Sequence, residues 1–392
     1  MFSLRSSAIV LLVCGHVAIA AEPRFLGRAE IPATATDLSG QSGELEGGIP
    51  ANQLGAHGSG IAWLGQGNRY AMIPDRGPAD GKSAYRCRYH VVEITVADNS
   101  APIKVELLET HLLSNRAGIP LIGSLKALPK AKDPRGVRFD PEAIRASGNG
   151  RLLISEEYGP SILEFGADGR QIASVQVPSR YAIANPSADP TSELPPKNTH
   201  GRQPNRGFEC LATSPDANTV YSLLQSPLIQ DGAVDELNKR VGTNVRLLEI
   251  NRLSGITREY LYPLEHPSNG CNEIEYLAPG RFLVIERDSK AGSEAAVKLI
   301  MEIDIRQATD ISKIDSLPVT GIPAGVTAVA KRPFLNLLDP RWRLAGPAFP
   351  EKIEGIALGP TLRDGSRVLL ITSDNDFLPV PTHIYAFAMR VD

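Results

Sequence analysis

The chain has 392 residues, which is enough for one large domain or two ordinary ones. Its hydrophobic content of 42% and charged content of 22% are typical of a globular protein with a substantial core. The formal net charge of −3 argues against a basic nucleic-acid-binding protein, and no nucleic-acid partner is expected. The 35 Gly and 31 Pro favour many tight turns between short strands.

The first 21 residues have the pattern of an export signal. Arg5 precedes a mostly apolar run from 8 to 20, and the small residues before Ala20 and Ala21 place a cleavage site there. The run is short for a membrane span, and no later run is long enough. We therefore expect a signal peptide over residues 1–21 and one domain over 22–392. The mature protein is expected to be secreted or periplasmic, monomeric and without a membrane span.

After a short strand expected at 25–31, a strand–turn–strand unit with a charged exit recurs five times. The first strands of the units are expected at 58–64, 140–145, 205–212, 271–277 and 352–358. The second strands follow at 70–77, 152–157, 219–225, 281–285 and 367–372. One or two alternating, β-branched strands complete each unit. A loop rich in Pro, Ser and Asn spans 178–203, and loops of this length are commonly functional or disordered.

The five units start near Ser59, Glu142, Glu209, Glu273 and Glu354, at irregular spacings of about 64 to 83 residues. Repeated units of about four antiparallel strands predict an all-β fold, a β-propeller with five recognisable repeats. Long inserts leave room for a sixth blade, so five or six blades are expected. The absence of a 3.6-residue period excludes a helical solenoid. The strand at 25–31 is expected to pair with the last blade and close the ring.

Carboxylates recur at the start of the first strand and at the exit of the second. If the repeats are equivalent, these side chains converge at one end of a central channel. Clustered carboxylates repel one another and are costly to bury, and a hard cation with oxygen ligands relieves both problems. Alternatively, each strand-start Glu accepts hydrogen bonds from backbone N–H groups and ties blades together. The predicted Ca²⁺ ligands are drawn from Asp75, Glu142, Glu156, Glu157, Glu209, Glu273, Glu286, Asp288, Glu354 and Asp374.

Basic side chains accompany these acids, and guanidinium groups bind phosphate in a bidentate manner. The pattern therefore favours a small anionic, phosphorylated substrate. The alternative is that each Arg pairs with a neighbouring carboxylate and that Tyr158 packs on its own turn. No GxSxG, Walker A or GxGxxG motif is present. The predicted catalytic residues are Glu157, Arg287 and Arg76, and the predicted substrate-binding residues are Arg206, Tyr158, Arg145 and His57.

Three cysteines follow the signal: Cys87, Cys210 and Cys271. An oxidising compartment permits one disulfide among them. Cys210 and Cys271 occupy similar places in adjacent repeats and are the expected pair, while three buried free thiols stay open as the alternative. No CxxC or HxxxH spacing supports a zinc or haem site.

Several segments resemble the signature segments of the phytase-like family, also called "esterase-like activity of phytase". They lie at 140–144, 154–160, 205–212, 223–227, 282–288 and 352–357, and the resemblance runs from about residue 58 to 388. Ala143 and Cys210 stand where the family usually has Gly after the Glu. The resemblance implies a secreted propeller that hydrolyses phosphate esters with Ca²⁺, as β-propeller phytases do. Two other classes stay open, a non-catalytic periplasmic binding or scaffold propeller and a Ca²⁺-dependent lactonase-type propeller.

Overall fold

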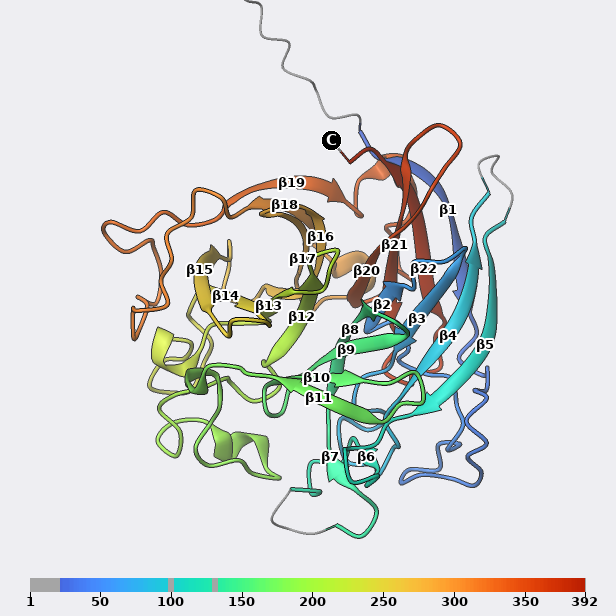
Figure 1. The fold of residues 1–392 in the computed structure, drawn as a ribbon, viewed down its shortest axis with the longest axis horizontal. Helices are drawn as coiled ribbons and strands as arrows, with labels where there is room; N and C mark the ends of the chain where they lie inside the picture. Colours follow the sequence, from blue (N-terminus) through green and yellow to red (C-terminus); the bar gives the residue numbers. More distant parts are fainter. Residues whose placement is uncertain (1–21, 98–101, 129–132, 392) are drawn as a thin grey trace, which may run out of the picture.

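The computed structural model describes residues 22–97, 102–128 and 133–391, so the expected signal peptide and its cleavage site lie outside the described residues. Within these ranges the chain forms five four-stranded sheets arranged in a ring (Figure 1). The prediction of an all-β propeller is confirmed, and the number of blades is five. Each expected repeat corresponds to one blade.

Each blade is an antiparallel sheet whose strands follow one another in the chain, except that the last blade borrows its outer strand from the N-terminal side. The first blade contains β2 (Gly60–Trp63), β3 (Arg69–Ile73), β4 (Arg88–Thr95) and β5 (Lys104–Leu112). The second contains β8 (Pro141–Gly148), β9 (Arg151–Glu156), β10 (Ser161–Phe165) and β11 (Gln171–Val175). The third contains β12 (Phe208–Thr213), β13 (Thr219–Leu224), β14 (Asn244–Asn251) and β15 (Thr257–Pro263). The fourth contains β16 (Gly270–Ala278), β17 (Arg281–Arg287), β18 (Lys298–Asp304) and β19 (Ala330–Asn336). The fifth contains β20 (Lys352–Thr361), β21 (Arg367–Asp374), β22 (Thr382–Met389) and β1 (Arg24–Ile31).

The remaining elements are short. A parallel pair, β6 (Leu121–Ile122) and β7 (Val137–Arg138), lies in the connection between the first two blades. Single 3₁₀ turns occur at Ser179–Tyr181, Pro190–Glu193, Ile229–Asp231, Gly292–Glu294 and Pro340–Trp342. Within the residues that the structure describes, no helix has the length and apolar character needed to cross a membrane.

The innermost strands of the five blades surround the central channel. β2 contacts β8 and β20, β12 contacts β8 and β16, and β16 contacts β20, so the five strands form a closed ring. The apolar core lies between neighbouring blades, because alternate side chains of each strand face one neighbour or the other. Ile144 and Ile154 of the second blade pack with Ile73 of the first, for example, and Ile356 of the fifth packs with Ile285 of the fourth.

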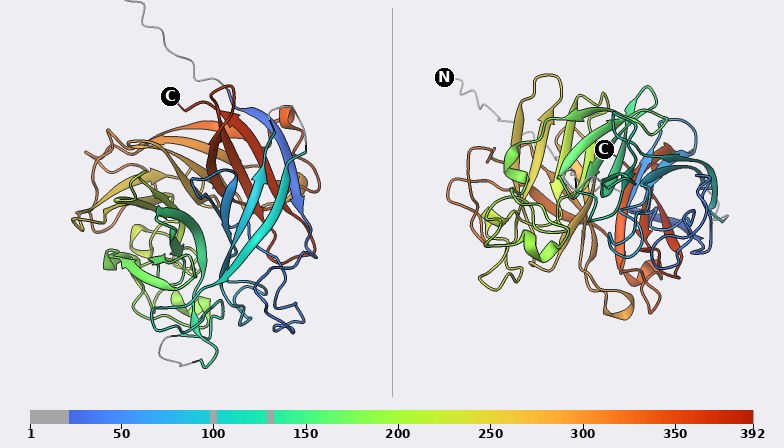
Figure 2. Two further views of the ribbon diagram at one scale, coloured as in Figure 1. Left: turned by 45° about the vertical axis from the view of Figure 1, so that its right-hand side comes forward. Right: turned by 90° about the horizontal axis from the view of Figure 1, so that it is seen from below.

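The ring is closed by β1, which pairs with β22 as predicted. Its register runs from Arg24 opposite Ala388 to Ile31 opposite Thr382, and the blue strand lies alongside the red strands of the last blade (Figure 2). Phe25 packs on Phe387 with ring centroids 5.1 Å apart. The outer edge of the last blade is therefore covered by the other end of the chain, which ties the two ends of the propeller together.

Candidate functional site

A pocket of about 180 Å³ lies where the inner strands begin, and we call it the channel-mouth pocket. In β12 the pairing passes from Phe208 to Cys210, which leaves Glu209 outside the ladder as an extra residue. Irregularities at the same place in β8 and β20 involve Glu142 and Glu354. Such bulges re-aim a side chain, and here they bring three predicted glutamates to one pocket. Its lining is Asp75, Arg76, Asp80, Glu142, Glu157, Asn205, Arg206, Glu209, Gln225, Arg287, Ser289, Glu351, Lys352, Glu354 and Asp376.

The exits of the second strands form the other part of this pocket. Glu157 and Arg287 come from the ends of β9 and β17, and both line the pocket. The backbones pack closely here, because a Cβ placed on Gly207 would lie 2.2 Å from the carbonyl oxygen of Glu157. Only glycine allows the second and third blades to approach in this way.

The fourth blade departs from the predicted equivalence by one residue. In β16 the pairing passes from Cys271 to Glu273, so the extra residue of this bulge is Asn272. The Asn272 Nδ2 donates to Glu209 Oε1 at 3.0 Å. Glu273 instead accepts two backbone N–H groups at 2.9 Å and lies 3.1 Å from Arg145, away from the pocket lining. Glu273 therefore ties strands together, as the alternative interpretation of the strand-start glutamates expects.

The carboxylates of this region form two groups, each with oxygens within 4.8 Å of one another. We call Asp140, Glu142 and Glu157 the Glu142 group, and Asp75, Asp374 and Asp376 the Asp374 group. Glu209 adds Oε2, which is buried and has no hydrogen-bond partner among the described residues. Because Ca²⁺ accepts several carboxylate oxygens in flexible geometry, this set of donors fits a calcium ion.

Three of the four cations in the pocket are paired with carboxylates. Arg76 Nη1 lies 2.6 Å from Asp140 Oδ2, and Arg287 Nη2 lies 2.5 Å from Glu354 Oε1. Lys352 Nζ lies 2.9 Å from Asp374 Oδ2 and 2.7 Å from Asp376 Oδ1. The alternative that basic residues pair with nearby acids therefore holds for Arg76 and Arg287.

Arg206 differs from these cations. Its guanidinium lines the channel-mouth pocket and has no hydrogen bond or ion pair to any of the described residues. Burial and the charge of Arg240 lower the pKa of Arg206 to about 10. It stays protonated near neutral pH and is the cation of the pocket that is available to an anionic ligand.

The pocket disfavours the charged forms of most of its acids. Burial raises the pKa of Asp75 and that of Asp140 to about 7. Burial, followed by the charges of neighbouring carboxylates, also raises the pKa of Glu142 and Glu209. Burial acts in the same direction on Glu354, but the charges of Lys352 and Arg287 outweigh it and lower the pKa of Glu354. The excess of carboxylates over cations favours a bound cation.

Arg145 blocks the channel below the pocket. Its guanidinium donates to the carbonyl oxygens of Ile61 at 2.9 Å, Ile274 at 2.8 Å and Ile356 at 3.3 Å, which belong to β2, β16 and β20. It also lies 3.4 Å from Glu275. Arg145, which was predicted to bind substrate, is thus buried and links the inner strands of different blades. A separate cavity of about 140 Å³, lined by Arg145 and Glu275, lies at the opposite end of the channel.

Other predicted ligands have structural partners outside the pocket lining. Glu156 accepts from the backbone N–H groups of Tyr158 and Gly159 and closes its own turn. Glu286 accepts from Tyr262, Asn269 and Lys331 at 2.9 to 3.1 Å, and Asp288 is 2.9 Å from Lys298 Nζ.

Two predicted substrate contacts also lie elsewhere. Tyr158 donates its hydroxyl to the carbonyl of Gly123 at 2.9 Å, which lies in the connection between the first two blades and not in the turn of Tyr158. The imidazole of His57 is buried beside His90, with ring centroids 6.2 Å apart, and burial lowers its pKa to about 4. Neither residue lines the channel-mouth pocket.

The predicted ligands did not include Asp140, Asp376, Lys352 or Gln225, which belong to this site. Asp140 and Lys352 each stand two residues before a bulge glutamate, so a repeat comparison extended by two residues would have included them. Gln225 donates to Glu209 and occupies a second-strand exit, where the search for carboxylates passed over it.

The expected disulfide is not formed. Cys87, Cys210 and Cys271 are free and buried, which is the alternative that the sequence left open. The bulges explain the error, because Cys210 follows the extra residue of β12 whereas Cys271 precedes that of β16. The two cysteines are therefore not at equivalent positions in their blades.

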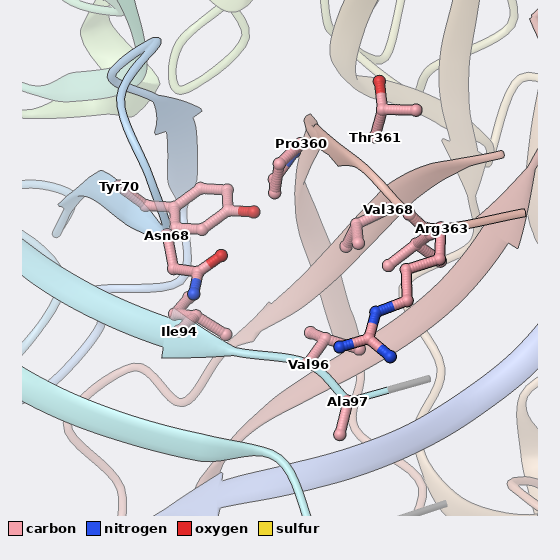
Figure 3. A pocket seen from close by; sticks show the side chains of 10 residues that line it. Asn68, Tyr70, Ile94, Val96, Ala97, Pro360, Thr361, Arg363 and Val368 are labelled. Carbon is pink, nitrogen blue, oxygen red and sulfur yellow. The ribbon is translucent and has the colours of Figure 1, made fainter. Parts of the chain in front are cut away.

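A larger cavity of about 470 Å³ lies between the first and fifth blades. Figure 3 shows Asn68, Tyr70 and Ile94 on the first-blade side and Pro360 and Val368 on the fifth-blade side. No carboxylate, imidazole or thiol is part of its lining, within the residues described. This cavity therefore contains none of the predicted ligands.

Several known proteins are similar to this chain. An uncharacterized secreted protein of Arthroderma benhamiae is 29% identical over 298 residues, which cover 60% of this chain and 56% of that protein. The chain thus spans little more than half the length of this relative. The solved structure of the Dos1 propeller is 9% identical to this chain, with a TM-score of 0.34. The match covers 87% of this chain and 69% of the Dos1 chain. The structure of the periplasmic gluconolactonase PpgL of Pseudomonas aeruginosa is 11% identical, with a TM-score of 0.38. The match covers 94% of this chain and 99% of the PpgL chain. The Phytase-like family, described as esterase-like activity of phytase, matches residues 52–377, and the chain belongs to this family.

Proposed function

We propose that the channel-mouth pocket binds a divalent cation, Ca²⁺, together with a small anionic substrate, and that it hydrolyses a phosphate ester. The observation that carries this proposal is the meeting of carboxylate groups with the unpaired guanidinium of Arg206 in one pocket. Carboxylates alone would repel a phosphate group. A cation that offsets them, beside an available Arg, creates a site for it.

The residues that would hold the ion are carboxylates of the Glu142 group, with Glu209 beside them. A bound Ca²⁺ supplies positive charge for the phosphoryl oxygens and the leaving oxygen. Arg206 binds and orients the phosphoryl group. Arg76 and Arg287 are held by their carboxylate partners and add positive charge to the lining of the pocket beside the phosphoryl group. Water then attacks phosphorus, the ester P–O bond breaks, and the products are an alcohol and inorganic phosphate.

We further propose that the protein acts as an exported monomer. The signal-like N-terminal pattern supports export, and the relative described as secreted agrees with it. A calcium site with carboxylates of raised pKa also suits a compartment in which calcium is plentiful.

The test measures phosphate release from p-nitrophenyl phosphate and from phytate, with Ca²⁺ or with a chelator. We expect release that requires Ca²⁺ and falls sharply in Arg206→Met, while Arg306→Met, which alters an exposed Arg paired with Asp304, stays near wild type. Binding of Ca²⁺ and phosphate without turnover would instead identify a binding propeller. Hydrolysis of lactones but not of phosphate esters would identify the lactonase class. Either result overturns the proposed hydrolase.

A further inference from the structure

The two carboxylate groups of the channel mouth differ in what already occupies them. Lys352 Nζ lies 2.9 Å from Asp374 Oδ2, 2.7 Å from Asp376 Oδ1 and 3.8 Å from Asp75 Oδ2. These are the three members of the Asp374 group. Its ammonium therefore stands where a metal ion bound to this group would stand.

The geometry makes the two occupants mutually exclusive. Carboxylate oxygens bind Ca²⁺ at about 2.3–2.6 Å. An ion at that distance from Asp374 and Asp376 would overlap the Lys352 nitrogen, which is itself only 2.7 to 2.9 Å from the same oxygens.

In the Glu142 group a resident cation pairs with Asp140 and Glu157 but not with Glu142. Arg76 approaches the group from one side, 2.6 Å from Asp140 and 3.4 Å from Glu157. Glu142 has no hydrogen bond or ion pair to any of the residues described, although it lines the pocket. Glu209, which is only 5% exposed, lines the same pocket and keeps Oε2 without a partner. Among the described residues no cation pairs with Glu142 or Glu209, although Arg206 lines the same pocket.

We propose that the channel-mouth pocket holds one divalent cation, bound by the Glu142 group and Glu209, and that Lys352 is a built-in cation that fills the place of a second. This inference rests on the proposed function for the presence of the ion. It adds the number of ions, their position and the residue that limits them. Removing the ammonium of Lys352 opens a second cation site on the Asp374 group.

The test is calorimetric titration of Ca²⁺ into chelator-stripped protein, which measures stoichiometry without any turnover. We expect one ion for wild type, two for Lys352→Met and none for Glu142→Gln. Glu351→Gln is the matched control, because it removes a carboxylate of the same pocket that belongs to neither group, and it should still bind one ion. Melting curves give a second readout, since Ca²⁺ should stabilise Lys352→Met more than wild type.

Two ions in wild type, or one ion in Lys352→Met, would overturn the inference. If Lys352→Met does not fold, Lys352→Gln takes its place under the same expectation. Failure of the proposed hydrolase is recognised separately: the stoichiometries come out as expected while no phosphate ester is hydrolysed. Absence of any ion in wild type would overturn both this inference and the calcium dependence of the proposed function.

Discussion

Replacing Arg145 with Met removes the guanidinium whose hydrogen bonds join the inner strands of the propeller. The change leaves the carbonyls of Ile61, Ile274 and Ile356 without their donor and Glu273 without its cation, all in the buried channel. Breaking a buried ion pair by removing one partner costs about 3–5 kcal/mol. Relaxation and water entry offset part of the lost hydrogen bonds, so we expect the free energy of unfolding to fall by about 3–5 kcal/mol rather than by the sum of all contacts.

The assay is urea unfolding followed by fluorescence and by circular dichroism, so that the coincidence of the two curves checks two-state behaviour. Arg306→Met is the control, because this exposed Arg pairs only within its own turn and its loss should change stability little. The double variant Arg145→Met with Glu273→Gln should recover part of the loss, since it no longer buries an unpaired carboxylate. A loss below about 1 kcal/mol for Arg145→Met, or no recovery in the double variant, would show that Arg145 does not stabilise the inner strands in this way.

Three further predictions follow from the site and the core. Because burial raises the pKa of Asp75 and Asp140 to about 7, the folded chain binds protons more tightly than the unfolded chain. With a chelator present, the melting temperature should therefore fall as the pH rises from about 4 to 7, and Ca²⁺ should lessen this fall by binding beside Asp140; a flat or rising profile with the chelator contradicts the prediction. Arg206→Met should weaken phosphate binding in calorimetry by about 10- to 100-fold, the value of a charged hydrogen bond, and unchanged binding would exclude Arg206 as the anion ligand. Cys87, Cys210 and Cys271 should stay unreactive toward a thiol reagent in the native protein, and all three should react after denaturation without reductant. Only one reactive thiol among them after denaturation would show that the other two form a disulfide.

The propeller could be predicted from sequence because strand, turn and exit recur in local order. Each of the five predicted units became a blade, and the strand at 25–31 became β1 on the last blade. The number of blades stayed open at five or six because the lengths of the inserts do not reveal whether they contain strands. The inserts proved to be loops with single 3₁₀ turns and the short pair β6–β7.

The candidate site could be predicted in part. Five predicted ligands line the pocket, and a sixth, Asp374, lies in the carboxylate group beside it. Register explains the exception in the fourth blade: the bulge holds Asn272, so Glu273 points to Arg145 instead. A bulge moves a side chain by one position without altering the repeat pattern, and sequence comparison does not detect that shift.

The role of Arg145 depends on groups that no sequence motif marks. Its partners are main-chain carbonyls of β2, β16 and β20, which lie 84, 129 and 211 residues from Arg145 in the chain. Likewise, the pairing of Lys352 with Asp75 and Asp374 joins the first and last blades across the closed ring. Such contacts follow from the closure of the fold and could be found only in three dimensions.

The most direct test of the account is anomalous diffraction from crystals soaked in Mn²⁺, an oxygen-binding ion with a usable anomalous signal. We expect one strong peak at the channel mouth, bounded by Glu142, Glu157 and Glu209, and a second peak beside Asp374 only in Lys352→Met. A wild-type crystal with no peak in this pocket, or with its ion bound at Glu286 or Asp288 instead, would contradict the claim that the channel mouth is the metal centre.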